Sequence, residues 1–164
     1  MGLFRRRSTD DKVPALVPVP KMDELPSARL QSPARYLGTF TEAGDKVIGQ
    51  TLSAKSSSRL NLSDEALDVV RMAGSFRIPV TALRGATSAG EFDGAPVESL
   101  LVVRWEHGEQ EWRTGFRLDA TTTKTKRSGK TVVAPDPDRW VRTISKMSRK
   151  SAQGPRHGQE KGEA

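Results

Sequence analysis

The feature that most constrains the fold is one segment with the periodicity of an amphipathic helix, near the C-terminal end of the chain. Its apolar residues follow the spacing i, i+1, i+4, i+7 and share one face of a helix: Trp140, Val141, Ile144 and Met147. The preceding segment Asp-Pro-Asp at 136–138 favours a helix start, because a first-turn proline and acidic side chains suit the positive end of a helix. We therefore predict a helix over residues 137–149, with Trp140 as its core anchor. A lone helix of this kind buries its face only against a sheet or an open barrel.

The chain before this helix has the pattern of short β-strands. The strongest hairpin is predicted around a turn at 106–109, where Trp105, Trp112 and Phe116 should anchor a core. Alternating or β-branched segments predict further strands at 35–40, 59–62, 66–72 and 76–80, with a weaker one over 47–52. Pro79 indicates an edge strand or a bulge, because proline cannot donate to a ladder.

Three connections have the composition of turns or loops. We interpret residues 63–65 as a hairpin turn rather than a helix start, because the segment that follows is short and β-branched. Gly85, Gly90 and Gly94 indicate a mobile loop. Residues 120–134 are rich in Thr and Lys and predict a loop or a ragged hairpin.

The order of these elements predicts one β-rich domain with a helical cap and two extensions. Residues 1–34 hold five of the ten prolines and predict an extended or disordered arm. Residues 35–150 form the predicted domain. Residues 151–164 have no periodicity and predict a disordered tail.

Composition excludes several classes of function. The chain has no cysteine, and His107 and His157 are its only histidines, so neither a metal site nor a catalytic triad is expected. No apolar run approaches the roughly 20 residues needed to span a bilayer. These observations predict a soluble intracellular domain without cofactor or enzymatic activity.

The charge of the chain is distributed unevenly. Residues 35–119 carry ten basic and twelve acidic groups, whereas residues 120–164 carry eleven basic and four acidic groups. Nucleic-acid-binding domains usually interleave basic residues with aromatics on folded elements, and here the aromatics lie in the predicted body. We interpret the basic C-terminal region as a solvating or surface-attracting segment.

Four short motifs occur in an order that resembles a known family. They are Tyr-Leu-Gly-Thr at 36–39, Phe-Arg-Ile-Pro at 76–79 leading into Ala-Leu-Arg-Gly-Ala at 82–86, Leu-Leu-Val-Val-Arg-Trp at 100–105, and Thr-Gly-Phe-Arg at 114–117. Together they resemble the actinobacterial pleckstrin-homology-like (PH-like) domain proteins, over roughly residues 35–118. The resemblance implies a mainly β fold: a partly open antiparallel barrel of about seven strands capped by one C-terminal α-helix. Relatives commonly carry an N-terminal membrane-spanning helix where this chain has its arm, so an anchor is either missing or never existed.

Two anion-binding motifs are incomplete in this chain. Ser-Gly-Lys-Thr at 128–131 resembles the end of a phosphate-binding loop, but Lys124 stands where that motif needs a glycine. PH domains that bind phosphoinositides use basic residues in the first strand connection, and here Glu42 and Asp45 flank a lone Lys46. An anion site built from Arg113 and Arg117 is a further alternative, although cross-strand pairing with glutamates explains these arginines more simply.

The leading hypothesis is a non-enzymatic PH-like binding or scaffold module in the cytoplasm. Its partner is either a protein, recruited along a strand edge or groove, or the anionic inner face of the plasma membrane. The residues predicted to contact an anionic surface are Arg5, Arg6, Arg7, Lys124, Lys126, Arg127 and Lys130. The alternative is weak, non-specific association of the basic C-terminal segment with nucleic acid.

Overall fold

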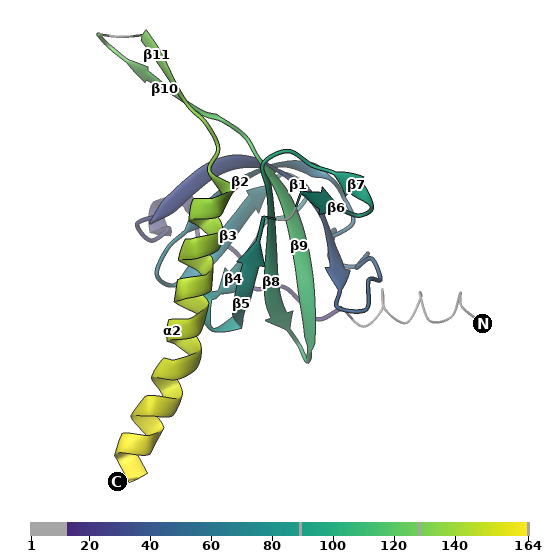
Figure 1. Cartoon of the computed structure of the whole chain (residues 1–164), viewed down its shortest axis with the longest axis vertical. Coiled ribbons are helices and arrows are strands. Elements are labelled where there is room, and N and C mark those ends of the chain that lie inside the picture. The colour runs from purple at the N-terminus through teal and green to yellow at the C-terminus, as the bar shows by residue number, and fades with distance from the viewer. Residues whose placement is uncertain (1–12, 89, 128, 164) are drawn as a thin grey trace, which may run out of the picture.

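Seven antiparallel strands form the main sheet, in the order β4-β3-β2-β1-β9-β8-β5 (Figure 1). The computed structural model describes residues 13–88, 90–127 and 129–163. The strands are β1 (Leu30–Thr41), β2 (Ser56–Leu62), β3 (Ala66–Arg71), β4 (Phe76–Pro79), β5 (Leu83–Thr87), β8 (Leu100–His107) and β9 (Gln110–Leu118). The edge strands β4 and β5 are consecutive in the chain and are joined by the 3-10 helix η2 (Val80–Ala82). The main sheet is that of the predicted partly open barrel.

Strand β1 begins at Leu30, so the arm does not extend to residue 34 as predicted. Pro33 lies inside this strand although it has no backbone donor. Its carbonyl accepts a hydrogen bond from the amide of Asp119 at 3.0 Å, just past the end of β9. The N–H position of a strand residue points to the same side as its carbonyl. The backbone nitrogen of Pro33 therefore points toward the chain beyond the end of β9, where the ladder needs no donor from it.

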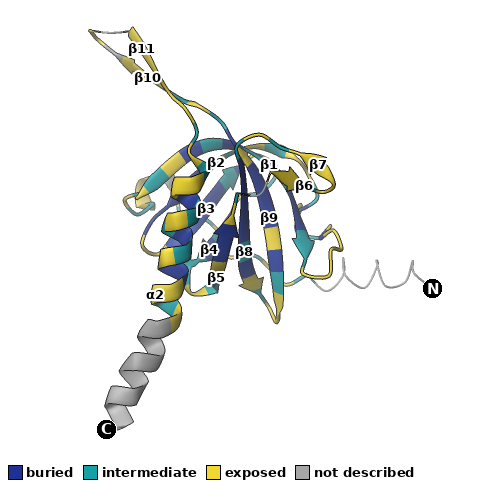
Figure 2. Ribbon diagram, in the orientation of Figure 1, coloured by how far each residue is buried: buried dark blue, intermediate teal, exposed yellow. Residues whose placement is uncertain are grey.

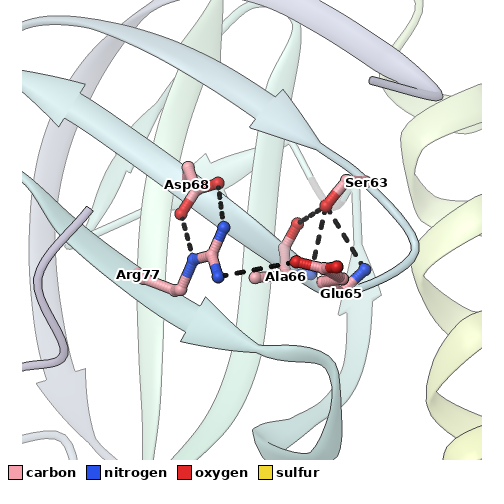
Figure 3. Close-up of polar contacts among 5 residues, drawn as sticks. All are labelled: Ser63, Glu65, Ala66, Asp68 and Arg77. Carbon is pink, nitrogen blue, oxygen red and sulfur yellow. Dashed lines mark hydrogen bonds and ion pairs between the residues drawn. The ribbon is translucent and has the colours of Figure 1, made fainter. Parts of the chain in front are cut away.

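The connection between β2 and β3 is the hairpin turn predicted at residues 63–65. The hydroxyl of Ser63 accepts hydrogen bonds from the amides of Glu65 and Ala66, both at 3.3 Å (Figure 3). A side chain that bonds to nearby backbone amides stabilises a turn without needing the first turn of a helix. The strand prediction for 66–72 is confirmed over Ala66–Arg71.

An ion pair links β3 to the edge strand β4. The buried carboxylate of Asp68 accepts two hydrogen bonds from Arg77, at 2.7 and 3.0 Å (Figure 3). This hydrogen bonding is the main cause of a raised pKa at Arg77. Pro79 ends β4 at the border of the sheet, so the edge position predicted for it is confirmed.

Two glycines bend the long strands of the barrel. The register of β1 against β9 shifts between Tyr36 and Gly38, where Gly38 has a φ of 138°. The register of β5 against β8 shifts in the same way next to Gly85, whose φ is 148°. Gly85 therefore belongs to a bulged strand and not to the predicted loop. Gly94 lies in the turn of a small hairpin formed by β6 (Glu91–Phe92) and β7 (Ala95–Pro96).

The weaker strand predicted over 47–52 is wrong. An isolated bridge between Phe40 and Lys46 continues β1 into this connection, and no strand is formed there among the described residues. Val47 and Leu52 are fully buried in the core, but they do not belong to a ladder. The apolar residues of this segment are explained by a loop that folds its side chains into the barrel.

Helix α2 (Pro137–Glu163) caps the barrel as predicted, packing against β5, η2 and β8 (Figure 1). The side chains of Trp140, Ile144 and Met147 are buried in the core. Figure 2 shows dark blue and teal bands along the part of α2 that runs beside the barrel. The helix extends far beyond residue 149, and the tail predicted to be disordered over 151–164 is helical as far as Glu163. Once its first turns are packed, a helix adds residues without needing an apolar face.

The described part of the arm lies against the barrel. Val13 and Leu16 are partly buried against the core, and the carbonyl of Val17 accepts a hydrogen bond from the amide of Arg77 at 2.8 Å. A short 3-10 helix, η1 (Met22–Glu24), follows before β1 begins. The arm is extended over most of its described length, as predicted, but it is packed on the domain.

Candidate functional site

The predicted basic cluster lies on a hairpin that projects from the barrel. Strands β10 (Thr121–Thr125) and β11 (Gly129–Val133) pair with each other in a sheet of two, and Figure 1 shows them extending past the end of the body. Lys124 and Lys130 are directly opposite in this ladder, so both side chains leave the same face. Lys126 and Arg127 lie in the turn between the two strands. All four side chains are exposed.

The sequence of the hairpin contains no acidic residue to balance these cations. Residues 120–135 include neither Asp nor Glu. Like charges directly opposite each other destabilise a ladder, and an isolated two-stranded hairpin is marginally stable in water. Val132 shares the face of the paired lysines through its partner Thr122 and is 64% exposed. The hairpin thus combines uncompensated positive charge with an exposed apolar side chain.

The structure brings together four of the seven predicted contact residues. Lys124, Lys126, Arg127 and Lys130 form the cluster that we call the basic tip. Arg5, Arg6 and Arg7 lie outside the described residues. Of the loop or ragged hairpin predicted at 120–134, the structure forms the hairpin. The register of its two strands places Lys124 opposite Lys130, which the spacing of the lysines in the sequence did not predict.

An acidic cavity of about 950 Å³ lies at another end of the barrel, between the end of β1 and the β8–β9 turn. Its lining includes four carboxylates: Glu42, Asp45, Glu109 and Glu111. The amide of Glu42 donates to the carbonyl of Glu111 at 3.2 Å, which places the two acidic segments side by side. None of the described residues that line this cavity is Lys or Arg. The sequence shows the acidic residues of each turn, 42–45 and 109–111, separately. Only the pairing of β1 with β9 brings the two turns together.

His107 lies at the border of this acidic cavity, and its contacts hold parts of the fold together. Its Nε2 is 3.0 Å from the carbonyl of Pro14, and its ring packs against Trp105 and Trp112 with centroid distances of 5.5 and 5.0 Å. These contacts fix the β8–β9 turn to the arm. These neighbours of the ring, a proline carbonyl and two indole rings, include no nucleophilic side chain that the histidine would activate.

A buried polar network crosses the interior of the barrel. The Tyr36 hydroxyl donates to the carbonyl of Leu52 at 2.6 Å and lies 2.6 Å from the hydroxyl of Thr39. Thr39 in turn lies 2.9 Å from the hydroxyl of Thr114, which accepts a hydrogen bond from the Trp105 indole at 2.9 Å. Burial raises the pKa of Tyr36 to about 12. All of these side chains are buried, so the network stabilises the interior of the barrel.

Arg71 fastens the loop that closes the barrel over this network. Its guanidinium donates to the carbonyls of Thr51, Ala54 and Gly74 at 2.6–3.0 Å. The same group lies 4.2 Å from the centroid of the Tyr36 ring. Burial lowers the pKa of Arg71. Sequence reasoning missed this role, because its partners are backbone carbonyls from two separate connections.

The remaining anion motifs do not form sites. The segment resembling a phosphate-binding loop forms the end of the β10–β11 hairpin, and a strand rather than a helix begins at Gly129; Ser128 lies outside the described residues. Arg117 pairs with Asp119 at 3.4 Å, and Arg104 lies 3.9 Å from Glu111. In β8 the residue opposite Arg113 is Arg104 and the residue opposite Arg117 is Leu100, so the predicted cross-strand pairing of these two arginines with glutamates is wrong.

Two further properties bear on function. Within the described residues, no group of three or more metal-ligating side chains is close enough to hold an ion. No helix in the part of the chain that the structure describes has both the length and the apolar character needed to cross a membrane.

Most of the chain matches a known protein family. Residues 13–131 match the family described as bacterial PH domain-like. This match covers the seven-stranded sheet, the docked arm and most of the basic hairpin. No curated protein matches the sequence significantly.

Proposed function

The chain belongs to the bacterial PH domain-like family, and from this premise we propose that it is a non-enzymatic binding and scaffold module that associates with an anionic membrane surface. The contact is made by the basic tip of the β10–β11 hairpin. The observation that supports this most is the ladder pair Lys124–Lys130, two like charges held opposite each other on a two-stranded sheet that stands apart from the main one. An anionic surface relieves that repulsion.

The side chains around the basic tip favour a lipid surface over nucleic acid. Proteins that bind single strands place aromatic side chains among their cations so that bases can stack on them. Residues 120–135 contain no aromatic residue, whereas Val132 and Val133 are 64% and 55% exposed. Cations beside exposed apolar side chains are typical of segments that lie at a bilayer interface.

The proposed location is the inner face of the plasma membrane, where anionic lipids concentrate. Arg5, Arg6 and Arg7 extend the proposal to the N-terminal segment, which adds three positive charges to the same chain. The association is peripheral and depends on salt, because the attraction of exposed charges falls off within about 10 Å at 0.1 M salt.

Cosedimentation with vesicles tests the proposal. Full-length protein is mixed with anionic and with neutral vesicles at low and at high salt, and the bound fraction is measured. We expect binding to the anionic vesicles only, and less of it at high salt. The double variant Lys124→Gln, Lys130→Gln should bind about 30-fold more weakly, since each basic residue near such a surface contributes about 1 kcal/mol.

The matched control removes two exposed lysines elsewhere. The variant Lys21→Gln, Lys55→Gln loses the same charge and should keep most of the binding, since neither residue lies on the hairpin. Equal binding of the wild type to both kinds of vesicle would rule the proposal out. Binding to single-stranded nucleic acid but not to vesicles would favour the nucleic-acid alternative instead.

A further inference from the structure

We propose that the basic tip of one copy of this chain docks into the acidic cavity of a second copy, so that copies join head to tail. This inference goes beyond membrane association and does not depend on it. It rests on two surfaces of opposite charge that one molecule presents at different ends.

The acidic cavity offers carboxylates that the rest of the described chain does not neutralise. Among the described residues, Glu42, Asp45 and Glu109 take part in no ion pair, and Glu111 reaches Arg104 only at 3.9 Å. The side chains of Glu42, Asp45 and Glu109 are exposed. Four acids around one hollow repel each other, so a cationic occupant stabilises the site.

The basic tip is opposite in charge to this cavity and is narrow. It carries four cations, and the cavity carries four carboxylates. The tip is only two strands wide, about 5 Å between strand axes, which suits a hollow of about 950 Å³. Its lysine pair leaves one face of the ladder and its turn adds two further cations, while the cavity presents acids from two turns.

The two surfaces cannot meet within one molecule. Figure 1 shows the β10–β11 hairpin beyond one end of the long axis and the β8–β9 turn at the opposite end of the barrel. Contact between them therefore needs a second copy. The two patches differ, so the contact is heterologous. A pair joined by one such contact leaves one tip and one cavity free, and on this proposal further copies add there to make an open chain.

Sedimentation velocity of the full chain tests the proposal. At low salt, the average sedimentation coefficient of the wild type should rise with protein concentration, and high salt should abolish the rise. The tip variant, Lys124→Glu with Lys130→Glu, should associate at least about tenfold more weakly. The cavity variant, Glu42→Lys with Glu109→Lys, should lose association to the same extent.

Mixing the two variants gives the sharpest measurement. The tip variant keeps an intact cavity and the cavity variant keeps an intact tip, so a mixture should form one-to-one pairs that do not grow further. The control variants make the same charge changes at exposed positions elsewhere, Lys21→Glu with Lys55→Glu and Glu24→Lys with Glu98→Lys. Both controls should associate like the wild type.

Three results would overturn the proposal: a wild type that stays monomeric at low salt, a mixture that forms no pairs, or a closed dimer that does not grow. The same proteins separate this inference from the proposed function. The cavity variant keeps its tip and should still bind anionic vesicles. Pairs in the mixture without vesicle binding by the wild type refute only the membrane proposal, and the reverse result refutes only self-association.

Discussion

At the scale of the residue, Tyr36 connects several parts of the barrel through one side chain. It is the only tyrosine of the chain and is fully buried. Its hydroxyl joins β1 to the loop at Leu52, while its ring supports the guanidinium of Arg71. The hydroxyl therefore holds its proton more tightly in the folded protein than in an unfolded chain.

This proton makes stability depend on pH in the alkaline range. Burial raises the pKa of Tyr36 from 10.0 to about 12. Between these values the unfolded chain loses the proton and the folded chain keeps it, so the free energy of unfolding falls as pH rises through that window. Below the lower value this group contributes no pH dependence.

The absorbance of tyrosinate measures this directly, since no second tyrosine interferes. We expect the signal of the folded protein to appear near the upper pKa, with urea unfolding showing a parallel loss of stability. Tyr36→Phe should flatten the alkaline part of the stability profile. Tyrosinate formation near pH 10.0 in a protein that stays folded would contradict the prediction.

The hydrogen bonds of the Tyr36 network could not be predicted from the pattern of residues within one segment. The motif at 36–39 predicted a strand, and Thr114 fell in another predicted strand. Only the register of β1 against β9 pairs Thr39 with Thr114 and makes a satisfied network of their hydroxyls. Register depends on long-range pairing, which periodicity within one segment does not contain.

At the scale of the element, α2, the helix that caps the barrel, was the most predictable part of the fold. Asp136 accepts a hydrogen bond from the amide of Arg139 at 3.1 Å, and Pro137 takes the first helical position. These local signals and the apolar stripe agree, so the start of α2 and its buried face were both predicted. The stripe carries no information on where the helix ends, because its last turns do not depend on an apolar face.

Removing the anchor of α2 should destabilise the whole domain. Trp140 is only 4% exposed and lies in the core cluster. Trp140→Ala should lower the free energy of unfolding by about 3–5 kcal/mol, the usual cost of removing a large buried aromatic side chain. Arg139→Ala, one residue earlier and exposed, should change it by less than about 0.5 kcal/mol.

Chemical denaturation followed by circular dichroism measures both variants, and the change in midpoint gives the difference. A Trp140→Ala protein as stable as the wild type would mean that α2 does not close the barrel.

The connection at 47–52 shows the opposite case at this scale. Its aliphatic residues fit a strand as well as they fit a loop that folds inward. What decides is Arg71, whose bonds to the carbonyls of Thr51 and Ala54 hold the loop. Gln50 and Thr51 have φ values of 56° and 61°, which a regular strand does not allow.

At the scale of the whole molecule, the arm is part of the domain. Between Val13 and Val17 it packs on the core, contacts His107 and pairs with β4. Pro14 within this segment and Pro18 directly after it prevent a longer ladder. The proline content predicted the extended backbone, but the docking depends on surfaces that exist only once the barrel has formed.

Hydrogen exchange tests the docking of the arm. In a chain lacking residues 1–17, the amide of Arg77 loses its acceptor and should exchange faster, and the free energy of unfolding should fall by about 1–2 kcal/mol. A chain lacking only residues 1–12 keeps Val17 and should behave like the wild type. The amide of Leu118, bonded to Ser99, serves as an internal reference. Unchanged exchange at Arg77 in the shorter chain would show that the arm does not protect β4.

The covered borders of the main sheet have a consequence for the protein in a crowded cell. An exposed edge strand has unpaired N–H and C=O groups with which a strand of another chain can pair, and such pairing leads to aggregation. Here Val17 occupies the hydrogen-bonding position of β4 at Arg77, and α2 packs against β5. The protein is therefore expected to resist amyloid-like stacking, even though its core is built from a β-rich, partly open shell.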